Sequence, residues 1–273
     1  MTINNRIQIA GHLEVTMSNP NGDPDAEGQP RIDHDTGHGF ITDVAIKRKV
    51  RDYIAKALDA PLLIADGSII NDTLGAVKRA DGESFTEAVC RQFVDVRLFG
   101  GVISTGDNKD AGNLRGPVQI TWAQSLDPVR VLDVGIQRCA ATNKKEHRQQ
   151  QSGRKAVIAY GIYRFDAVIN PADAAKTGMT EADLEVLIAG LRDGWDITPA
   201  AGRTQVDVRS LVVHRHRSPL GDEPVWVSRA RVQLTNPTGD PEARWEQREL
   251  LIRADDADIV ETVAQANEWS RVA

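Results

Sequence analysis

The sequence predicts an α+β fold in which strands and helices share one domain, and two observations indicate it. Apolar residues recur in some stretches with the period of two that is typical of strands, and in others at the spacing typical of helices. In chain order the predicted elements read β-α-α-β-β-β-α-β-β-α, so hairpins stand beside strand–helix–strand units. A split β-α-β core of the ferredoxin or RNA-recognition type fits this order. No linker interrupts the 273 residues, which predicts a single domain.

The individual elements follow from the same patterns. Alternating apolar residues predict strands over residues 6–17, 117–125, 130–138, 157–169, 205–217 and 224–234. Apolar stripes at helical spacing predict helices over residues 43–58, 84–100, 180–191 and 255–270. Thr42, Ser84 and Thr180 are the expected N-caps, and Glu87 and Asp183 occupy capping-box positions.

Residues 6–17, the loop after them and residues 142–155 complete this prediction. Residues 6–17 alternate cleanly, so we expect a strand with one buried and one exposed face. A stretch dense in turn formers follows it and runs as a long loop to about Phe40. Residues 142–155 are rich in polar and basic side chains, so we expect a second long loop there.

The first predicted helix is expected to pack inward while its first turns present cations. Its apolar stripe consists of Ile46, Val50, Tyr53, Ile54, Ala57 and Leu58. Lys47, Arg48 and Lys49 fall largely off that stripe, and Arg51 stacks one turn beyond Lys47. We therefore expect these four side chains to be available to an anionic partner.

Charge is segregated along the chain although the net charge is −6. Residues 47–51 contain four Lys or Arg and no acid, and residues 138–155 contain six against one Glu. Residues 203–231 contain six Arg against three acids, whereas residues 237–273 contain nine acids against four Arg. Nucleic-acid binding requires a basic stripe rather than a basic protein, so the net charge does not exclude it. Solvated faces would give the same charge runs.

Several classes of protein are disfavoured. No apolar run has the length needed to cross a bilayer, and the N-terminus lacks the three regions of a signal peptide. Cys90 and Cys139 are the two cysteines, and they have no metal-ligand spacing, which favours a reduced cytoplasmic protein. The motifs of nucleotide binding, serine hydrolysis and zinc proteolysis are missing. We therefore expect no cofactor.

Metal binding and acid–base chemistry remain weaker alternatives. Residues 19–28 place oxygen-bearing side chains at alternate positions like a calcium loop, but they lack its glycine and terminal glutamate, so a shaped turn is favoured. His214 and His216 share one strand face without a third ligand, and polar strand residues are the simpler interpretation. The carboxylates that paired acid–base chemistry could use are Asp23, Asp25, Asp33 and Asp35.

The remaining candidate binding residues are cations, amides and planar aromatic side chains. The cations suited to phosphates are Lys47, Arg48, Lys49, Arg51, Arg115, Lys144, Lys145, Arg154 and Lys155. Asn143 and Gln119 are suited to sugars or backbone. Tyr160, Tyr163 and Trp226 could stack on unpaired bases, although the alternation of the strand favours a core position for Tyr163 and Phe165.

At this point the sequence resembles a known family, the Cas-seven family of CRISPR type I effectors, with the type I-C branch closest. Three consecutive blocks carry the resemblance: NPNGDPD from Asn19 to Asp25, PRIDHDTGHGFITD from Pro30 to Asp43, and VAIKRKVR from Val44 to Arg51. The match continues through FVDVRLFGG (93–101), LRGPVQI (114–120), SLDPV (125–129), ATNK (141–144), GRK (153–155), YGIYR (160–164) and SPLGDEP (218–224).

The resemblance implies an RNA-recognition-like palm with finger and thumb insertions. The expected insertions are the loops 18–41, 101–116 and 141–155 and the hairpin 205–234. It also implies a non-catalytic subunit that stacks head to tail with its own copies along one CRISPR RNA and presents the RNA to target DNA. The other implied partners are a Cas-five-like subunit and the large and small subunits of the complex, and no membrane is involved.

The resemblance also implies which residues bind the guide RNA. Carried over position by position, they are Asn19, Asn21, Asp23, Arg31, Lys47, Arg48, Arg51, Arg115, Gln119, Asn143, Lys144, Lys145, Arg154 and Lys155. Asn19, Asn21 and Asp23 are expected to shape the RNA groove. The stretch STGDNKDAGN after Ile103 and the unmatched residues 237–273 depart from the family pattern.

One alternative activity follows from the same resemblance. Related backbone subunits of type III effectors cut target RNA with an aspartate in the loop between the first strand and the first helix. This chain carries acids in that loop, so metal-dependent RNA cleavage is the alternative to a purely structural role.

Overall fold

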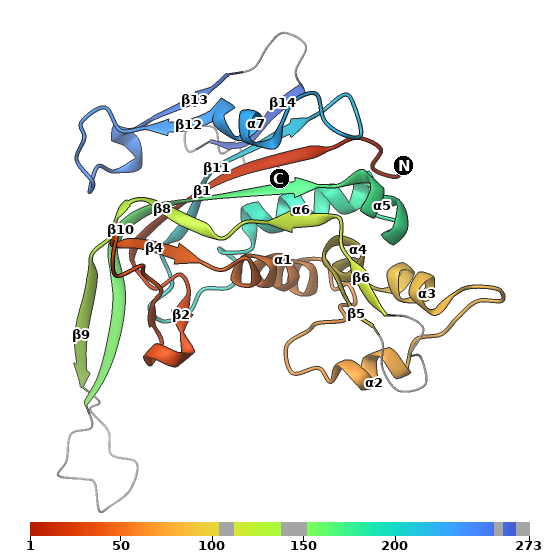
Figure 1. The fold of residues 1–273 in the computed structure, drawn as a ribbon. Helices are drawn as coiled ribbons and strands as arrows, with labels where there is room; N and C mark the ends of the chain where they lie inside the picture. The colour runs from red at the N-terminus through yellow and green to blue at the C-terminus, as the bar shows by residue number, and fades with distance from the viewer. Residues whose placement is uncertain (104–111, 138–151, 254–258, 266–273) are drawn as a thin grey trace, which may run out of the picture.

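The computed structural model describes residues 1–103, 112–137, 152–253 and 259–265. One large antiparallel sheet runs through it, with strands in the order β14-β11-β1-β10-β8-β4 and with β7 and β9 also paired to β10 (Figure 1). These strands are β1 (Ile7–Ser18), β4 (His38–Ile41), β7 (Val118–Ile120), β8 (Ala123–Pro128), β9 (Val131–Gln137), β10 (Ser152–Ile169), β11 (Val206–Arg215) and β14 (Ile259–Gln265).

Three small two-stranded sheets and the helices complete the described part. The small sheets pair β2 (Gly22–Asp23) with β3 (Gln29–Pro30), β5 (Gly100–Val102) with β6 (Asn113–Arg115), and β12 (Val232–Thr235) with β13 (Glu249–Ile252). The helices are α1 (Asp43–Ala57), α2 (Ile70–Gly75), α3 (Phe85–Gln92), α4 (Val94–Phe99), α5 (Pro171–Thr177), α6 (Glu181–Asp193) and α7 (Val225–Arg231).

The sheet is covered on both faces. Helices α1 and α6 lie below it in Figure 1, and their apolar residues join Leu13, Tyr163 and Leu211 of the central strands in the main core. Above it lie α7, β12 and β13, where Val232 packs against Ala10. Because both faces are covered, β1 is buried along most of its length, and the prediction of a half-exposed strand is wrong.

The central elements have a topology that is found in many proteins. In chain order, β1, α1, β8, β10, α6 and β11 alternate as β-α-β-β-α-β, and the four strands lie in the order β11-β1-β10-β8. The neighbouring pairs are all antiparallel. The mixed α/β class with a main antiparallel sheet is therefore confirmed.

Local capping signals placed three helices correctly. Thr42 accepts a hydrogen bond from Ala45 N and begins α1, while Ser84 with Glu87 and Thr180 with Asp183 form the predicted capping boxes. The helix that was expected to continue from Ser84 to Gly100 is broken at Phe93 into α3 and α4.

Other predicted elements are wrong. Residues 225–231 form helix α7 rather than a strand, and β12 pairs with β13, so the predicted hairpin over 205–234 does not form. Residues 259–265, expected to be helical, form strand β14 against β11. Residues 152–155, expected in a loop, begin strand β10 and pair with β9.

The helices of the described part include none that is long and apolar enough to cross a bilayer.

Candidate nucleic-acid interface

Helix α1 is held firmly at both its start and its inner face. Asn21 Oδ1 accepts hydrogen bonds from the backbone N–H of Thr42 at 2.9 Å and from its hydroxyl at 3.0 Å, which ties the first loop to the N-cap. Ile46, Val50 and Ile54 are buried in the main core. Gly190 of α6 allows close packing, because a Cβ there would lie 3.0 Å from a Val50 methyl group. The outer face of α1 is therefore fixed relative to the sheet.

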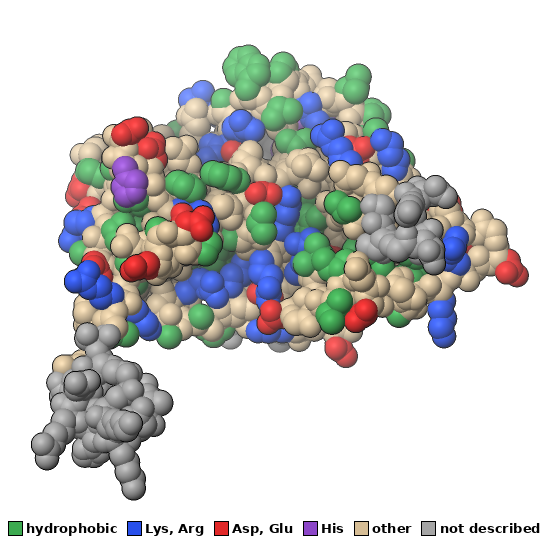
Figure 2. Space-filling model, turned by 60° about the horizontal axis from the view of Figure 1, so that its bottom comes forward, with side chains coloured by type: hydrophobic (Ala, Val, Ile, Leu, Met, Phe, Trp, Pro, Cys, Tyr) green, Lys and Arg blue, Asp and Glu red, His purple; other side chains and the backbone are tan. Residues whose placement is uncertain are grey.

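A basic groove lies along this outer face. It is a cavity of about 290 Å³ between residues 48–56 of α1, residues 62–66 and the turn 198–203. Its cations are Arg48, Arg51, Lys56 and Arg203, and its carboxylates are Asp52 and Asp66. We call these six residues the basic groove. Figure 2 shows Lys and Arg side chains gathered over the middle of the face that is lowest in Figure 1.

The cations of the basic groove are only partly neutralised. Arg48 Nε donates to Asp52 at 2.7 Å, and its guanidinium lies 3.4 Å from Asp66, whose side chain is 89% exposed. Such an exposed ion pair is worth little and is readily exchanged for another anion. Arg203 has no carboxylate within ion-pair distance in the described part of the chain. The groove therefore has an excess of positive charge.

Lys49 is a buried cation next to Thr198, which lines the groove. Its ammonium group donates to the Thr198 hydroxyl and lies 4.9 Å from the centre of the Trp195 ring. Burial, followed by the nearby charge of Arg203, lowers the pKa of Lys49 to about 8.

The predicted orientation of the α1 cations is correct for Arg48 and wrong for two others. Lys49 and Arg51 are buried, and Arg51 Nε donates to the buried Asp95 carboxylate at 3.0 Å. The Lys47 side chain is 18% exposed and pairs with Asp43 at 2.8 Å, outside the basic groove. Side chains off the apolar stripe are therefore buried because neighbouring segments supply polar partners.

Side chains of the loop that follows β1 form hydrogen bonds and an ion pair that fix this loop in the structure. Asn19 donates to the carbonyl oxygens of Gly28 at 2.7 Å and Ala156 at 3.4 Å, which joins the loop to β10. Asp23 caps the short 3₁₀ turn that follows it and forms an ion pair with Arg31 at 3.0 Å. These side chains bond to other parts of the protein, and the expectation that Asn19, Asn21 and Asp23 shape an RNA groove stays a prediction.

Arg154 and Lys155 lie at the start of β10, in the ribbon that β10 forms with β9. Figure 1 shows this ribbon leaving the sheet on the side of α1. Arg154 is exposed and lies 3.3 Å from Asp133. A Cβ at Gly202 would lie 4.0 Å from the Lys155 side chain, so Lys155 stands beside the turn that carries Arg203. The structure thus brings Lys155 near the basic groove.

Arg115 and Gln119 lie elsewhere. Gln119 pairs with Val168, which is thirteen residues further along β10 than Lys155. Arg115 is exposed and lies 3.6 Å from Asp173 of α5. The structure therefore separates these two residues from the basic groove. Asn143, Lys144 and Lys145 lie outside the described residues.

The aromatic residues proposed for base stacking divide between core and surface. Tyr160 and Tyr163 are buried, as is Phe165, which confirms the core position predicted for Tyr163 and Phe165. Trp226 is 70% exposed, but it belongs to α7, on the opposite side of the sheet from α1 (Figure 1).

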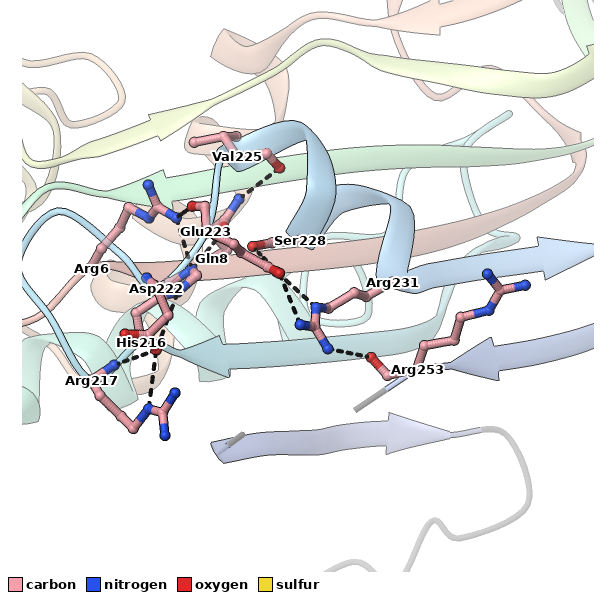
Figure 3. Close-up of polar contacts among 10 residues, drawn as sticks. All are labelled: Arg6, Gln8, His216, Arg217, Asp222, Glu223, Val225, Ser228, Arg231 and Arg253. Carbon is pink, nitrogen blue, oxygen red and sulfur yellow. Dashed lines mark hydrogen bonds and ion pairs between the residues drawn. The ribbon is translucent and has the colours of Figure 1, made fainter. Parts of the chain in front are cut away.

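The histidine pair lies at the end of β11, where the ring of His216 is held by hydrogen bonds. The Asp222 N–H donates to His216 Nδ1 at 3.1 Å, so Nε2 carries the proton, and it donates to Gln8 Oε1 at 2.7 Å (Figure 3). Both ring nitrogens of His216 are therefore used, and no lone pair remains for a metal ion. The His214 ring lies 4.3 Å from it, centre to centre.

Two of the four loop aspartates, Asp23 and Asp33, have local structural roles. Asp33 accepts hydrogen bonds from the Thr36 hydroxyl at 2.7 Å and from Asp35 N at 3.0 Å, and these bonds, led by that of Thr36, lower the pKa of the Asp33 carboxyl. Among the described residues, no three His, Cys, Asp or Glu side chains are grouped as metal ligands.

Sequence reasoning missed Lys56 and Arg203 as members of the interface. Lys56 lies in the last turn of α1, after the cationic run that drew the prediction. Arg203 follows Gly202 in a turn without any motif, and Thr16 and Asn19 position that turn through backbone hydrogen bonds to Gln205 and Gly202. This placement is a tertiary contact, so no local pattern could have indicated it.

Comparison with known proteins places the chain in a family. The family model described as CRISPR-associated protein Cas7 matches residues 5–252. A protein of Haloferax volcanii named CRISPR-associated protein Cas7 is 30% identical over 214 residues, which cover 68% of this chain and 63% of that protein. The chain therefore spans about 63% of the length of this curated relative.

Solved structures share the fold at low sequence identity. A chain of a CRISPR RNA-guided surveillance complex in a pre-nicking state has a TM-score of 0.55 and 13% identity, with 81% of this chain and 80% of that chain covered. A chain of a second CRISPR RNA-guided surveillance complex has a TM-score of 0.50 and 15% identity, with 81% and 72% covered. The family model and the relative show that the chain belongs to the CRISPR-associated Cas7 family.

Proposed function

We propose that this protein coats a CRISPR RNA as the repeated, non-catalytic backbone subunit of a type I surveillance complex in the cytoplasm. The basic groove carries the proposal. It places Arg48, Lys56 and Arg203 at one accessible surface beside Lys155, and such cations bind phosphates whatever the base sequence. Membership of the Cas7 family and likeness in fold to chains of RNA-guided surveillance complexes support the same role.

The finer assignments extend this proposal. The β11-β1-β10-β8 strand order supports an RNA-recognition-like palm, from which the β9–β10 ribbon and the first loop project as finger or thumb elements. The motif blocks support the type I-C branch. The proposed partners are further copies of the chain, a Cas-five-like subunit, the large and small subunits, and target DNA that pairs with the guide.

The non-catalytic part of the proposal rests on the local roles of the loop acids. Asp23 is paired with Arg31, and Asp33 is held in its own turn. Incubation of the purified protein with labelled RNA and Mg²⁺ or Mn²⁺ tests this part. We expect intact RNA, whereas metal-dependent cleavage that is lost in Asp33→Ala or Asp35→Ala would establish the type III-like alternative.

The RNA-binding part is tested by reversing charge in the groove. Arg48→Glu with Arg203→Glu is expected to weaken binding of single-stranded RNA about tenfold or more for every sequence, and to reduce the slope of the salt dependence by roughly one unit for each phosphate that the groove no longer neutralises. Both side chains lie at the surface of the groove, so the fold should persist. The measurement is a binding titration at several salt concentrations with two unrelated RNA sequences.

Arg91→Glu is the matched control. Arg91 is similarly exposed and ion-paired, to Glu83, but it belongs to α3 outside the groove. Its reversal should leave the RNA affinity unchanged. Arg91→Glu changes the net charge by two and the groove variant by four, so a loss of binding free energy in Arg91→Glu about half as large as in the groove variant would mean that net charge, rather than this groove, drives binding. Unchanged affinity in the groove variant would refute the site.

A further inference from the structure

An exposed pair of stacked rings stands at the start of α1. Trp122, in the segment between β7 and β8, lies parallel to Phe40 of β4, with the ring centres 5.4 Å apart and the planes inclined by 11°. Trp122 is nevertheless 57% exposed. Because Phe40 covers one face of the indole, this exposure belongs mainly to the other face.

The indole is fixed in place. Its Nε1–H donates to Asp43 at 3.2 Å, and the same carboxylate forms the ion pair with Lys47 at 2.8 Å. The preceding residue, Thr121, is bonded twice to Asp166 of β10, through its N–H at 2.8 Å and its hydroxyl at 3.0 Å. A ring held in this way loses little conformational freedom when a ligand covers its free face.

The ring pair lies near the basic groove along the axis of α1. Asp43, which holds the indole, precedes Arg48 by five residues on α1, or about 7.5 Å along the helix axis. Lys47 lies between them and brings a cation beside the rings. A nucleotide chain bound along this helix would therefore have phosphate partners and a flat apolar surface within a short distance.

We propose that the free face of Trp122 stacks on an unpaired base of the guide RNA. This inference rests on the proposed function and adds a base-binding residue to a site otherwise built for phosphates. Stacking is tolerant of sequence because every base has a π-face, so it suits a protein that binds any guide. The Trp122 indole would hold one base beside the start of α1, and the phosphates of the same strand would lie along the basic groove.

A base fits the observations better than a protein side chain does. The rings form a flat, nearly parallel pair, with Lys47 beside them and the basic groove further along α1, and proteins that bind single strands combine a stacking surface with a basic track. The other aromatic residues expected to stack are unsuited to this role, because Tyr160 and Tyr163 are buried and Trp226 lies across the sheet.

The test compares ordinary single-stranded RNA with an abasic strand of the same length and charge. Binding of the RNA-free, full-length protein to both strands is measured by fluorescence anisotropy over a range of salt concentrations. Trp122→Ala is expected to bind the ordinary strand about tenfold more weakly, with an unchanged salt slope, and to bind the abasic strand like the wild-type protein. Trp122→Phe should retain most of the affinity, and Trp226→Ala should retain all of it.

The outcomes separate this inference from the proposed function. Equal losses on both strands in Trp122→Ala would overturn the stacking role, as would an unchanged affinity for the ordinary strand. A variant that binds isolated RNA normally but no longer associates with further copies would instead assign Trp122 to a protein contact and also overturn it. Failure of the proposed function would appear independently, as normal RNA affinity in the Arg48→Glu, Arg203→Glu protein.

Discussion

At the scale of single residues, two glycines in the matched sequence blocks are required for close packing. A Cβ at Gly39 would lie 2.2 Å from the Tyr163 hydroxyl oxygen, so the GHGF and YGIYR blocks fit together only with glycine at position 39. Gly116 is equally constrained, because a Cβ there would lie 2.1 Å from the carbonyl carbon of Phe99. Arg203, in contrast, lies in the basic groove outside every matched block. Motif matching therefore identifies the fold more readily than the interface.

His216 makes stability depend on pH. Burial, followed by the charges of His214 and Arg6, lowers the pKa of His216 from 6.5 to about 4 in the folded protein, although Asp222 and Glu223 act in the opposite direction. His216 takes up a proton at a higher pH in the unfolded chain than in the folded protein. Its contribution to stability is therefore fully present above pH 6.5 and is lost as the pH falls toward 4. We expect a loss of roughly 1–3 kcal/mol between pH 7 and pH 4.5 from this group.

Urea unfolding of the wild-type protein and of His216→Gln across this range measures the effect. The variant lacks the titrating ring, so the difference in unfolding free energy between the two proteins should shrink as the pH falls. The carboxylates titrate in both proteins, so their contributions to the unfolding free energy cancel in the difference. A difference that stays constant from pH 7 to pH 4.5 would contradict the account of His216.

At the scale of elements, one buried carboxylate joins α1 to the segments beside it. Asp95 of α4 accepts hydrogen bonds from Arg51 of α1 at 3.0 Å and from the backbone N–H groups of Leu63 at 3.0 Å and Ile64 at 3.1 Å. Leu62, Ile64 and Ala65 line the basic groove. Asp95 therefore positions one wall of the groove against the helix that forms the other.

Replacement of Asp95 by Ala is expected to destabilise the protein by about 3–5 kcal/mol, because it leaves a buried guanidinium and two backbone donors without their acceptor. Thermal or urea unfolding monitored by circular dichroism measures this loss. Asp66→Ala removes an exposed carboxylate from the same groove and should change stability by less than about 0.5 kcal/mol. Comparable effects of the two substitutions would show that Asp95 is not the organising contact.

The elements show where sequence reasoning succeeds. Thr42, Ser84 and Thr180 begin their helices as predicted, because capping depends on residues within one turn of each other. Residues 259–265 were predicted to be helical, but the edge of β11 recruits them as a strand, which is a pairing across more than forty residues of chain. The burial of Lys49 and Arg51 likewise depends on Thr198 and Asp95, which are distant in sequence.

At the scale of the whole molecule, the cationic residues lie at two ends of one long strand. Lys155 and the position paired with Gln119 are separated by thirteen residues of β10, or about 40 Å of strand length. The basic groove lies near the first end, and Arg115 and Gln119 near the second. The proposed RNA-binding residues thus lie at both ends, an arrangement that suits the proposed head-to-tail stacking, in which one copy continues the RNA path of the next.

The most direct test of the central claim is the mass of the complex formed with RNA of increasing length. RNA-free protein would be mixed in excess with single strands of two unrelated sequences, each in several lengths, and the mass measured by size-exclusion chromatography with light scattering. The account predicts that the number of copies rises in proportion to RNA length and is the same for both sequences. A fixed single copy per strand, or binding to only one of the sequences, would contradict a backbone that coats its guide.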